Sequence, residues 1–251
     1  MSKAHEYKFL YMILAGLMLF LSSCVETEVS NIEPSFDFHS LLKIANIASG
    51  SSVTSVTVIN NSTGVTEGEF PIAVGTENPA EGQAFMDIQS GSKRFILHGT
   101  GSVDGQLFIQ TLDSERKYRV YIFNSDSGET SLLKSDLRYT WQQKGTEQGK
   151  NLFYPDSAFV GLLNFHTDAA VAFIEVMGPD TTVIDLHLAP IENGDHSTFM
   201  LAAPNNFTIN LYSPDEELIT TLSLSAAGAA RYSAVLYGVR SEVAAKIFTD
   251  D

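Results

Sequence analysis

The sequence has 251 residues, of which 44% are hydrophobic and 18% charged, and its formal net charge is −15. This acidity argues against nucleic acid as a partner, because binding a phosphate backbone requires clustered lysine and arginine. Here adjacent basic residues form isolated pairs such as Lys93-Arg94 and Arg116-Lys117. One cysteine excludes an internal disulfide, so the stability of the fold has to come from packed cores.

The first 23 residues have the order of a bacterial lipoprotein signal peptide. Lys3 and Lys8 make the start positive, an apolar run covers residues 9–21, and Ser22-Ser23-Cys24 follows directly. That order is typical of a signal peptide with a lipobox, so we expect cleavage before Cys24 and lipid on its thiol and freed amine. One alternative is a transmembrane helix, but the run is shorter than the roughly 20 residues required. Another is a secretory signal cut elsewhere, which would leave Cys24 as a free thiol.

Residues 24–40 are predicted to be a flexible tether, because they are mostly polar, acidic and without periodicity. Acidic residues just behind a lipid-bearing cysteine resemble the export tag of some Gram-negative lipoproteins. Loss of the leader would remove Lys3, Lys8 and Glu6, which makes the remaining chain one charge more acidic. We therefore expect a cell-envelope protein that is attached to a membrane, the outer membrane, through lipid on Cys24.

From residue 41 onward the sequence is typical of β-strands. Short runs rich in Val, Ile, Phe and Tyr, such as residues 55–58, 95–98 and 118–122, are separated by Gly, Asn, Asp, Ser and Pro. Outside the leader, no stretch of ten or more residues keeps the 3.6-residue apolar period of a helix. Asp104-Gly105, between two such runs, predicts a tight hairpin turn in which both central residues have positive φ.

The strand pattern occurs twice in the chain. Two domains are therefore predicted, at residues 41–138 and 158–251, each large enough for a core of its own. Between them, residues 139–157 are predicted to be a polar linker. This linker carries Trp141, either as an exposed contact residue or packed at the domain junction. The matched segments, in chain order, are 41–48 with 159–166, 53–58 with 171–176, 95–97 with 207–209, 118–123 with 232–237, and 133–136 with 247–250.

The two copies resemble the family called domain of unknown function 4397. In that family a hydrophobic strand ends in Asn and is followed by a small polar turn and a second strand, with a Gly-x-x-x-Phe/Tyr strand and Tyr-containing strands later. The resemblance covers most of residues 41–136 and 159–250. The residues that carry it are 44–47 and 162–171 at the two openings, 91–95 in the later strand, and Tyr118 and Tyr232 in the last strands.

The resemblance implies an all-β fold of two tandem antiparallel β-sandwiches of the immunoglobulin-like or transthyretin-like kind. It also implies frequent lipid anchoring at bacterial surfaces and no common activity. Asn46 and Asn164 would be structural residues whose side chains bond nearby backbone at a turn. Thr57 and Glu175 stand where the family usually has Asp, which is a departure from its pattern.

No catalytic apparatus is recognisable in the sequence. A G-x-S-x-G elbow is absent, and the glycine-rich residues 99–105 lack the spacing of a dinucleotide loop. Two pairs could ligate zinc if they converged, Asp185 with His187 and His166 with Asp168, although single histidines on strands are more often surface groups or hydrogen-bonded core groups.

We accordingly expect no metal, no cofactor and no catalytic residue, with Cys24 as the one functional position. The carboxylate pairs 216–217 and 250–251 are assigned to a turn and to the end of the chain, and the N-x-[ST] sequons at 60–63 and 206–208 to turns. These assignments give the polar residues structural rather than chemical roles.

The functional prediction is a non-enzymatic module at the bacterial surface, which binds a protein or glycan or spaces another component from the membrane. A structural subunit of a fimbrial or envelope assembly is the alternative, and exposed edge strands would favour it. A hydrolase or metal enzyme with a site between the domains is the third hypothesis.

Overall fold

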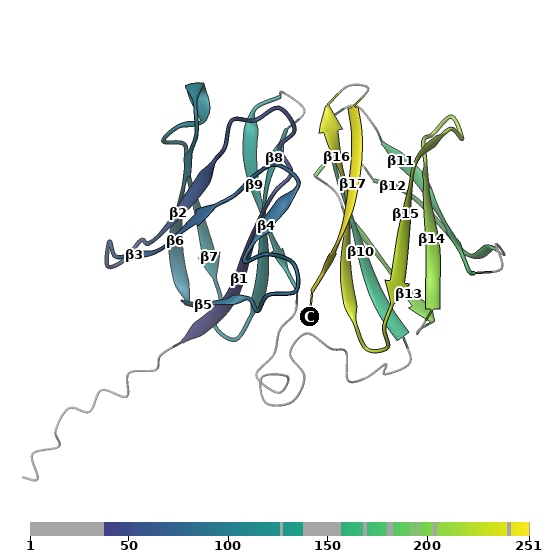
Figure 1. Ribbon diagram of the computed structural model, residues 1–251, viewed down its shortest axis with the longest axis horizontal. Coiled ribbons are helices and arrows are strands. Elements are labelled where there is room, and N and C mark those ends of the chain that lie inside the picture. The colour runs from purple at the N-terminus through teal and green to yellow at the C-terminus, as the bar shows by residue number, and fades with distance from the viewer. Residues whose placement is uncertain are drawn as a thin grey trace, which may run out of the picture. The chain divides into compact units, whose positions relative to one another are not determined.

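The computed structural model describes residues 38–125, 128–137, 157–167, 170–179, 183–191, 193–194, 196–202, 205–239 and 242–250 (Figure 1). Apart from one 3-10 turn at Gly101–Val103, all regular structure in these residues is β-strand. The all-β prediction is therefore confirmed. None of the described residues forms a helix with the length and hydropathy that a membrane span requires.

Two sheets from the first half of the chain pack face to face and form what we call the first sandwich. Strand alternation explains the packing, since β2 and β6 place Val56, Val58, Phe95 and Leu97 on one face, fully buried. One sheet has the order β4-β1-β8-β9, with β5 also on β1, and the other has the order β3-β2-β6-β7. The strands are β1 (His39–Asn46), β2 (Ser55–Asn60), β3 (Thr66–Pro71), β4 (Thr76–Asn78), β5 (Met86–Gln89), β6 (Gly91–His98), β7 (Leu107–Leu112), β8 (Lys117–Asn124) and β9 (Thr130–Asp136).

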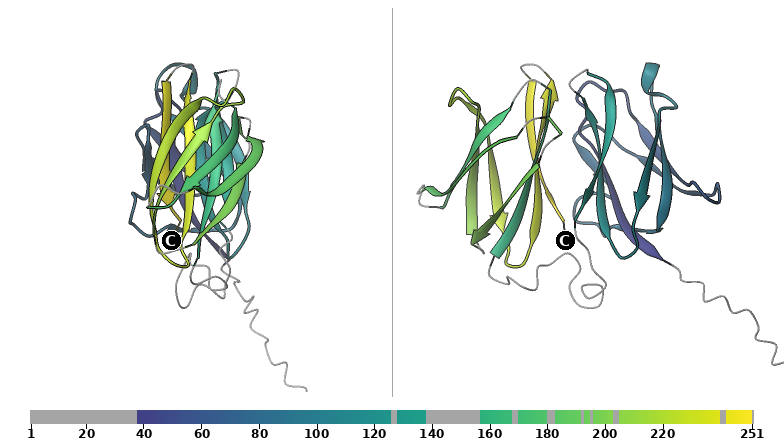
Figure 2. Two further views of the ribbon diagram at one scale, coloured as in Figure 1. Left: turned by 90° about the vertical axis from the view of Figure 1, so that its right-hand side faces the viewer. Right: turned by 180° about the vertical axis from the view of Figure 1, so that it is seen from behind.

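The second sandwich repeats this arrangement. Its sheets have the orders β13-β10-β16-β17 and β12-β11-β14-β15, and they enclose a core that includes Val160, Ile174, Ile209 and Leu236. The right-hand view of Figure 2 shows the two layers of each sandwich from behind. The strands are β10 (Ser157–His166), β11 (Val171–Met177), β12 (Val183–Ile191), β13 (His196–Ala202), β14 (Asn205–Tyr212), β15 (Leu218–Ala226), β16 (Arg231–Val239) and β17 (Glu242–Thr249).

The predicted repeat is present in the strand pairing. The five matched segments fall on strands with the same place in the two sandwiches, namely β1 and β10, β2 and β11, β6 and β14, β8 and β16, and β9 and β17. Leu41 lies opposite Lys117. Its counterpart Phe159 lies opposite Arg231, which keeps the register that the sequence match requires. The domain boundaries stay predictions, although β1 begins at His39, two residues before the predicted start.

Two of the sequence matches are displaced. Val58 pairs with Phe95, whereas its counterpart Val176 pairs with Ile209, so the residue equivalent to Phe95 is Ile209 and not Phe207. A slip of two residues keeps every side chain on the same face of the sheet, so the apolar pattern alone does not reveal it.

The match between the last strands of the two sandwiches, β9 and β17, is displaced by one residue. Tyr118 pairs with Asp136, while its counterpart Tyr232 pairs with Thr249, so the predicted match there is wrong by one position. These are edge strands of their sheets, where one partner strand is missing and the apolar pattern is weaker.

The expectation of purely antiparallel sheets is wrong at one strand pair in each sandwich. β1 runs parallel to β8, and β10 runs parallel to β16. Alternation along a strand decides which side chains face the core, but it carries no information on the direction of a neighbour. Both partners are far apart in the sequence, which leaves room for the long connection that parallel pairing needs.

The predicted hairpin at Asp104-Gly105 exists, but its turn is of another type. β6 and β7 pair antiparallel, and Gln106 N donates to Val103 O at 3.1 Å across the turn. Asp104 has φ −64° and ψ 125°, and Gly105 has φ 79°, which is a type II turn and requires positive φ at the second central residue only. The expectation of positive φ at Asp104 is therefore wrong.

Candidate functional site

Five charged residues are buried where the two sandwiches meet, and we call them the interface cluster. Lys43 is on β1, Glu77 on β4, Lys117 and Arg119 on β8, and Asp250 directly follows β17; none is more than 6% exposed. Ionised side chains are almost never this buried unless they are paired. The cluster therefore needs an explanation in terms of its partners.

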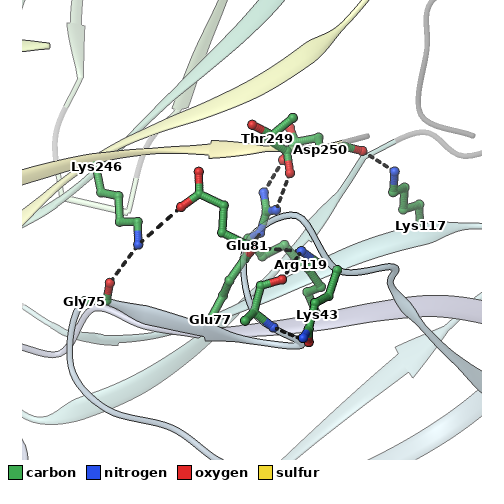
Figure 3. Close-up of polar contacts among 11 residues, drawn as sticks. Lys43, Gly75, Glu77, Glu81, Lys117, Arg119, Lys246, Thr249 and Asp250 are labelled. Carbon is green, nitrogen blue, oxygen red and sulfur yellow. Dashed lines mark hydrogen bonds and ion pairs between the residues drawn. The ribbon is translucent and has the colours of Figure 1, made fainter. Parts of the chain in front are cut away.

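Arg119 is bonded to both sandwiches (Figure 3). Its Nε donates to Glu77 Oε2 at 3.0 Å, within the first sandwich. Its Nη1 donates to Asp250 Oδ1 and its Nη2 to the carbonyl oxygen of Thr249 at 3.0 Å, both of the second. The fork of guanidinium donors suits this divided role.

The two lysines complete the cluster. Lys43 Nζ donates to Glu77 Oε1 at 2.7 Å, and Lys117 Nζ donates to the carbonyl oxygen of Asp250. Both amines and the Arg119 guanidinium lie over the ring of Phe85, with Nζ or Cζ atoms 5.0, 4.2 and 5.7 Å from its centroid. Cation–π attraction to this ring adds to the stability of three neighbouring positive charges.

An apolar cluster drawn from both sandwiches accompanies these charges. Ala45, Tyr121 and Phe123 of the first sandwich pack with Leu163, Phe165, Val235 and Phe248 of the second. The ring centroids of Phe123 and Phe165 are 4.6 Å apart, and those of Tyr121 and Phe165 are 5.3 Å apart. The two sandwiches therefore share a small core as well as an ion-pair network.

Burial shifts the ionisation of this region. Desolvation raises the pKa of the Tyr121 hydroxyl to about 12. Desolvation also opposes the charge on Arg119, but Asp250, with Tyr121 and Glu77, outweighs it and raises the pKa of Arg119 above its ordinary value. Arg119 therefore stays cationic.

The interface cluster is suited to holding the sandwiches together rather than to catalysis. Its carboxylates are engaged by Lys43, Arg119 and Ser233, whose Oγ donates to Asp250 Oδ2 at 2.9 Å. Among the described residues, no group of three His, Cys, Asp or Glu side chains could hold a metal ion.

A crevice of about 560 Å³ lies beside the interface cluster, between β9 of the first sandwich and β10 and β16 of the second. Its lining combines charges with an aromatic ring, since it includes Lys134, Asp136, Phe159 and Arg231. The guanidinium of Arg231 lies 5.5 Å from the centroid of Phe159. The volume is in the range of small-molecule sites.

The structure brings few of the sequence candidates together. Cys24, Trp141 and Asp168 lie outside the described residues. Asp185 and His187 belong to β12, but their side chains are also outside the description. His166 is buried at the end of β10, where its backbone N–H donates to Asn164 Oδ1 at 3.0 Å.

The structural role expected for Asn46 and Asn164 is confirmed. Both are fully buried at a strand end, and each side-chain oxygen accepts the backbone N–H two residues ahead, at 3.2 Å from Ala48 and 3.0 Å from His166. This is the Asx-turn geometry of a polar residue that closes a strand.

Sequence reasoning missed the interface cluster. It assigned Asp250 to an unremarkable chain end and treated Lys117 as one of the isolated basic residues, whereas both are buried. One signal was available: Lys43 interrupts an otherwise apolar strand, Leu41 to Ala45, and a lysine in such a place needs a partner.

No family model matches the chain, and no curated protein matches it. Solved structures that it resembles include a protein from Bacillus anthracis titled TIE, at 8% identity over 81% of this chain and 34% of that one, with a TM-score of 0.27. This chain thus spans about a third of that protein's length. A putative cell adhesion protein from Bacteroides uniformis matches at 9% identity over 85% of this chain and 98% of that one, with a TM-score of 0.26. The tip fimbrial protein of Porphyromonas gingivalis matches at 9% identity over 85% of this chain and 99% of that one, with a TM-score of 0.27. Similarity this low carries no argument about function.

Proposed function

We propose that this chain is a lipid-anchored protein of the bacterial cell envelope that acts as a non-enzymatic binding or spacer module. The leader that ends at Cys24 and the acidic residues behind it support the anchor and the outer-membrane location. Two or three acyl chains hold a protein on a bilayer far more firmly than one, at about 0.8 kcal/mol per buried methylene. A spanning segment is then unnecessary.

The spacer role is supported by the interface cluster. Two sandwiches joined by a polar linker alone would move independently, and such a chain would not hold a fixed length. Arg119, bonded to Glu77 in one sandwich and Asp250 in the other, ties them together. A fused pair of sandwiches has the stiffness that a spacer requires.

We also propose that the sandwiches are of the immunoglobulin-like or transthyretin-like kind. They would be tandem copies of the domain of unknown function 4397 family. The repeated strand order and the equivalent Asn46 and Asn164 support this assignment.

For the binding role, the crevice lined by Lys134, Phe159 and Arg231 is a candidate place for a protein or glycan ligand. An aromatic face with charges around it suits the apolar face and hydroxyl groups of a sugar or the side chains of a peptide.

Replacement of Cys24 tests the anchor. Cells that produce the wild-type chain should yield it in the membrane fraction, with a mature first residue Cys24 that carries fatty acid by mass spectrometry. The Cys24→Ala chain should carry no fatty acid. An uncut leader on the wild-type chain, or fatty acid that persists after the substitution, would contradict the proposal.

A structural subunit of a surface assembly is the second candidate, and β7 favours it. β7 is an edge strand of its sheet, and its Leu107 and Ile109 are 48% and 56% exposed. An edge with apolar side chains can accept a strand from another chain. If β7 serves this purpose, concentrated protein should self-associate in sedimentation experiments and Ile109→Lys should abolish the association, while a monomer at every concentration removes this candidate.

A further inference from the structure

Lys93 of β6 has a fully buried amine with one carboxylate beside it. Its side chain is 0% exposed, and its Nζ donates to Glu67 Oε1 at 2.7 Å. The other carboxylate oxygen, Glu67 Oε2, is buried without a hydrogen-bond partner among the described residues. An ion pair with incomplete hydrogen bonding is a weak source of stability, and such an unsatisfied group calls for another explanation.

Asn60 supplies a second reactive group at the same carboxylate. It is the last residue of β2 and lies directly opposite Lys93 in the β2–β6 register. Its Nδ2 donates to Glu67 Oε1 at 3.1 Å. One carboxylate oxygen therefore contacts both the lysine amine and the asparagine amide nitrogen, which places a base between a nucleophile and a leaving group.

The carbonyl group of the Asn60 side chain is polarised by the turn that follows. Asn60 Oδ1 accepts the backbone N–H groups of Ser62 at 3.0 Å and Thr63 at 3.2 Å. Two N–H donors aimed at one carbonyl oxygen are the arrangement that stabilises the oxyanion of acyl transfer. The sequence analysis assigned this sequon to a turn, and the turn's two N–H groups also prepare Cγ of Asn60 for attack.

We propose that Lys93 and Asn60 form an intramolecular amide cross-link, with Glu67 as the catalytic acid and base. Glu67 takes a proton from the Lys93 ammonium, and the freed Nζ attacks Cγ of Asn60. The oxyanion is held by the N–H groups of Ser62 and Thr63. Glu67 passes this proton to Nδ2 and takes a second proton from Nζ as the Cγ–Nδ2 bond breaks. Ammonia leaves and carries the second proton away, so that one ammonium ion is released in all. The Nζ–Cγ amide bond remains, no oxidation or reduction occurs, and no further reactant is needed.

The chain contains two internal comparisons. Lys43 meets Glu77 at 2.7 Å and is equally buried, but no side-chain amide among the described residues donates to that carboxylate. In the second sandwich Val176 and Ile209 are equivalent to Val58 and Phe95. The residues at the positions of Asn60 and Lys93 are therefore Gly178 and Phe207. The cross-link is therefore specific to the β2–β6 pair of the first sandwich.

Peptide mass spectrometry of the full-length purified chain tests the proposal. Trypsin releases residues 44–94 or 44–93 as one peptide, because no Lys or Arg lies between Lys43 and Lys93. A glutamyl protease then cuts after Glu67 and Glu69, between the two reacting residues. The cut leaves two fragments, which we call arms, one with Asn60 and the other with Lys93. The expected result is that the arms remain joined and that their mass is lower than that of the two linear fragments by one ammonia. Trypsin should also fail to cleave after Lys93.

Two arms that separate would overturn the proposal, even where ammonia is lost. That outcome would mean that Asn60 had cyclised onto its own backbone, or that the Lys93–Glu67 pair is an ordinary ion pair. Lys93→Arg keeps the positive charge and should give separate arms with no loss of ammonia, as should Glu67→Gln. Joined arms in Glu67→Gln would overturn the catalytic role of Glu67. The wild-type measurement decides the central point without requiring that any variant folds.

Discussion

Arg119 contacts acceptors from both sandwiches with its three guanidinium nitrogens, and it is fully buried. This one side chain therefore links the two sandwiches. The desolvation of a buried guanidinium is offset only if each partner is in place. Its carboxylate partners, Glu77 and Asp250, are therefore the residues whose loss should matter most.

Asp250→Ala should destabilise the folded chain by about 3–5 kcal/mol, because it leaves a buried arginine with one carboxylate instead of two. Urea unfolding followed by circular dichroism measures the change. Glu69→Ala, on the exposed side of β3, is the control and should shift the free energy of unfolding by no more than about 0.5 kcal/mol. Equal effects of the two substitutions would show that the interface cluster contributes nothing.

Tyr121 should make the fold sensitive to alkali. Burial raises its pKa from 10.0 to about 12 in the folded chain, so the folded state holds this proton more tightly than the unfolded state. The associated stability is complete below pH 10 and is lost as pH rises toward 12, by about 2–3 kcal/mol at 1.36 kcal/mol for each pKa unit. Urea midpoints across this pH range should fall less steeply in Tyr121→Phe than in the wild type. Parallel curves would contradict the assignment.

Sequence reasoning succeeded at residues whose bonds are local and failed at residues whose partners are distant. The turns at Asn46 and Asn164 were predictable because the side chain bonds backbone two residues ahead. Arg119 finds its acceptors at positions 77 and 250, and nothing in the neighbouring sequence identifies them. The sequence alone accordingly predicts no more than the end of the chain at Asp250.

Among the strands, alternation of apolar and polar residues predicted their existence and their buried faces. It predicted neither strand direction nor the exact register of the repeat. The parallel pair of β1 and β8 depends on the path of the chain between them. The match displaced by two residues at β14 keeps the same side chains on each face of the sheet, so the pattern does not reveal it.

The backbone at Gly99, just after β6, lies close to the backbone of Ser52. A Cβ at Gly99 would overlap the carbonyl oxygen of Ser52, so the backbone would have to shift. Gly99→Ala should cost about 1–3 kcal/mol, the usual range for overpacking. Gly161→Ala in β10 is the matched control, since the nearest atom to its Cβ would be Tyr232 O at 4.0 Å, and thermal unfolding should distinguish the two. A tolerated Gly99→Ala would contradict the packing described for this loop.

For the molecule as a whole, duplication and fusion explain the organisation. The sheets of the second sandwich repeat the strand order of the first. Packing of Tyr121 and Phe123 on Phe165 and Phe248 then joins the copies through a core that neither sandwich completes alone. A fused pair suits the proposed spacer or binding module, because a ligand or component carried by one sandwich is held in a fixed relation to the other.

The distance between spin labels on the two sandwiches tests the fusion directly. Cys24 is the single cysteine, so a Cys24→Ser chain with Ser62→Cys and Asp215→Cys, both exposed positions, can be labelled at two sites only. Pulsed electron paramagnetic resonance should give one narrow distance distribution, and adding Arg119→Ala should broaden it. A broad distribution in the chain that retains Arg119 would mean that the sandwiches move independently, and it would contradict the account.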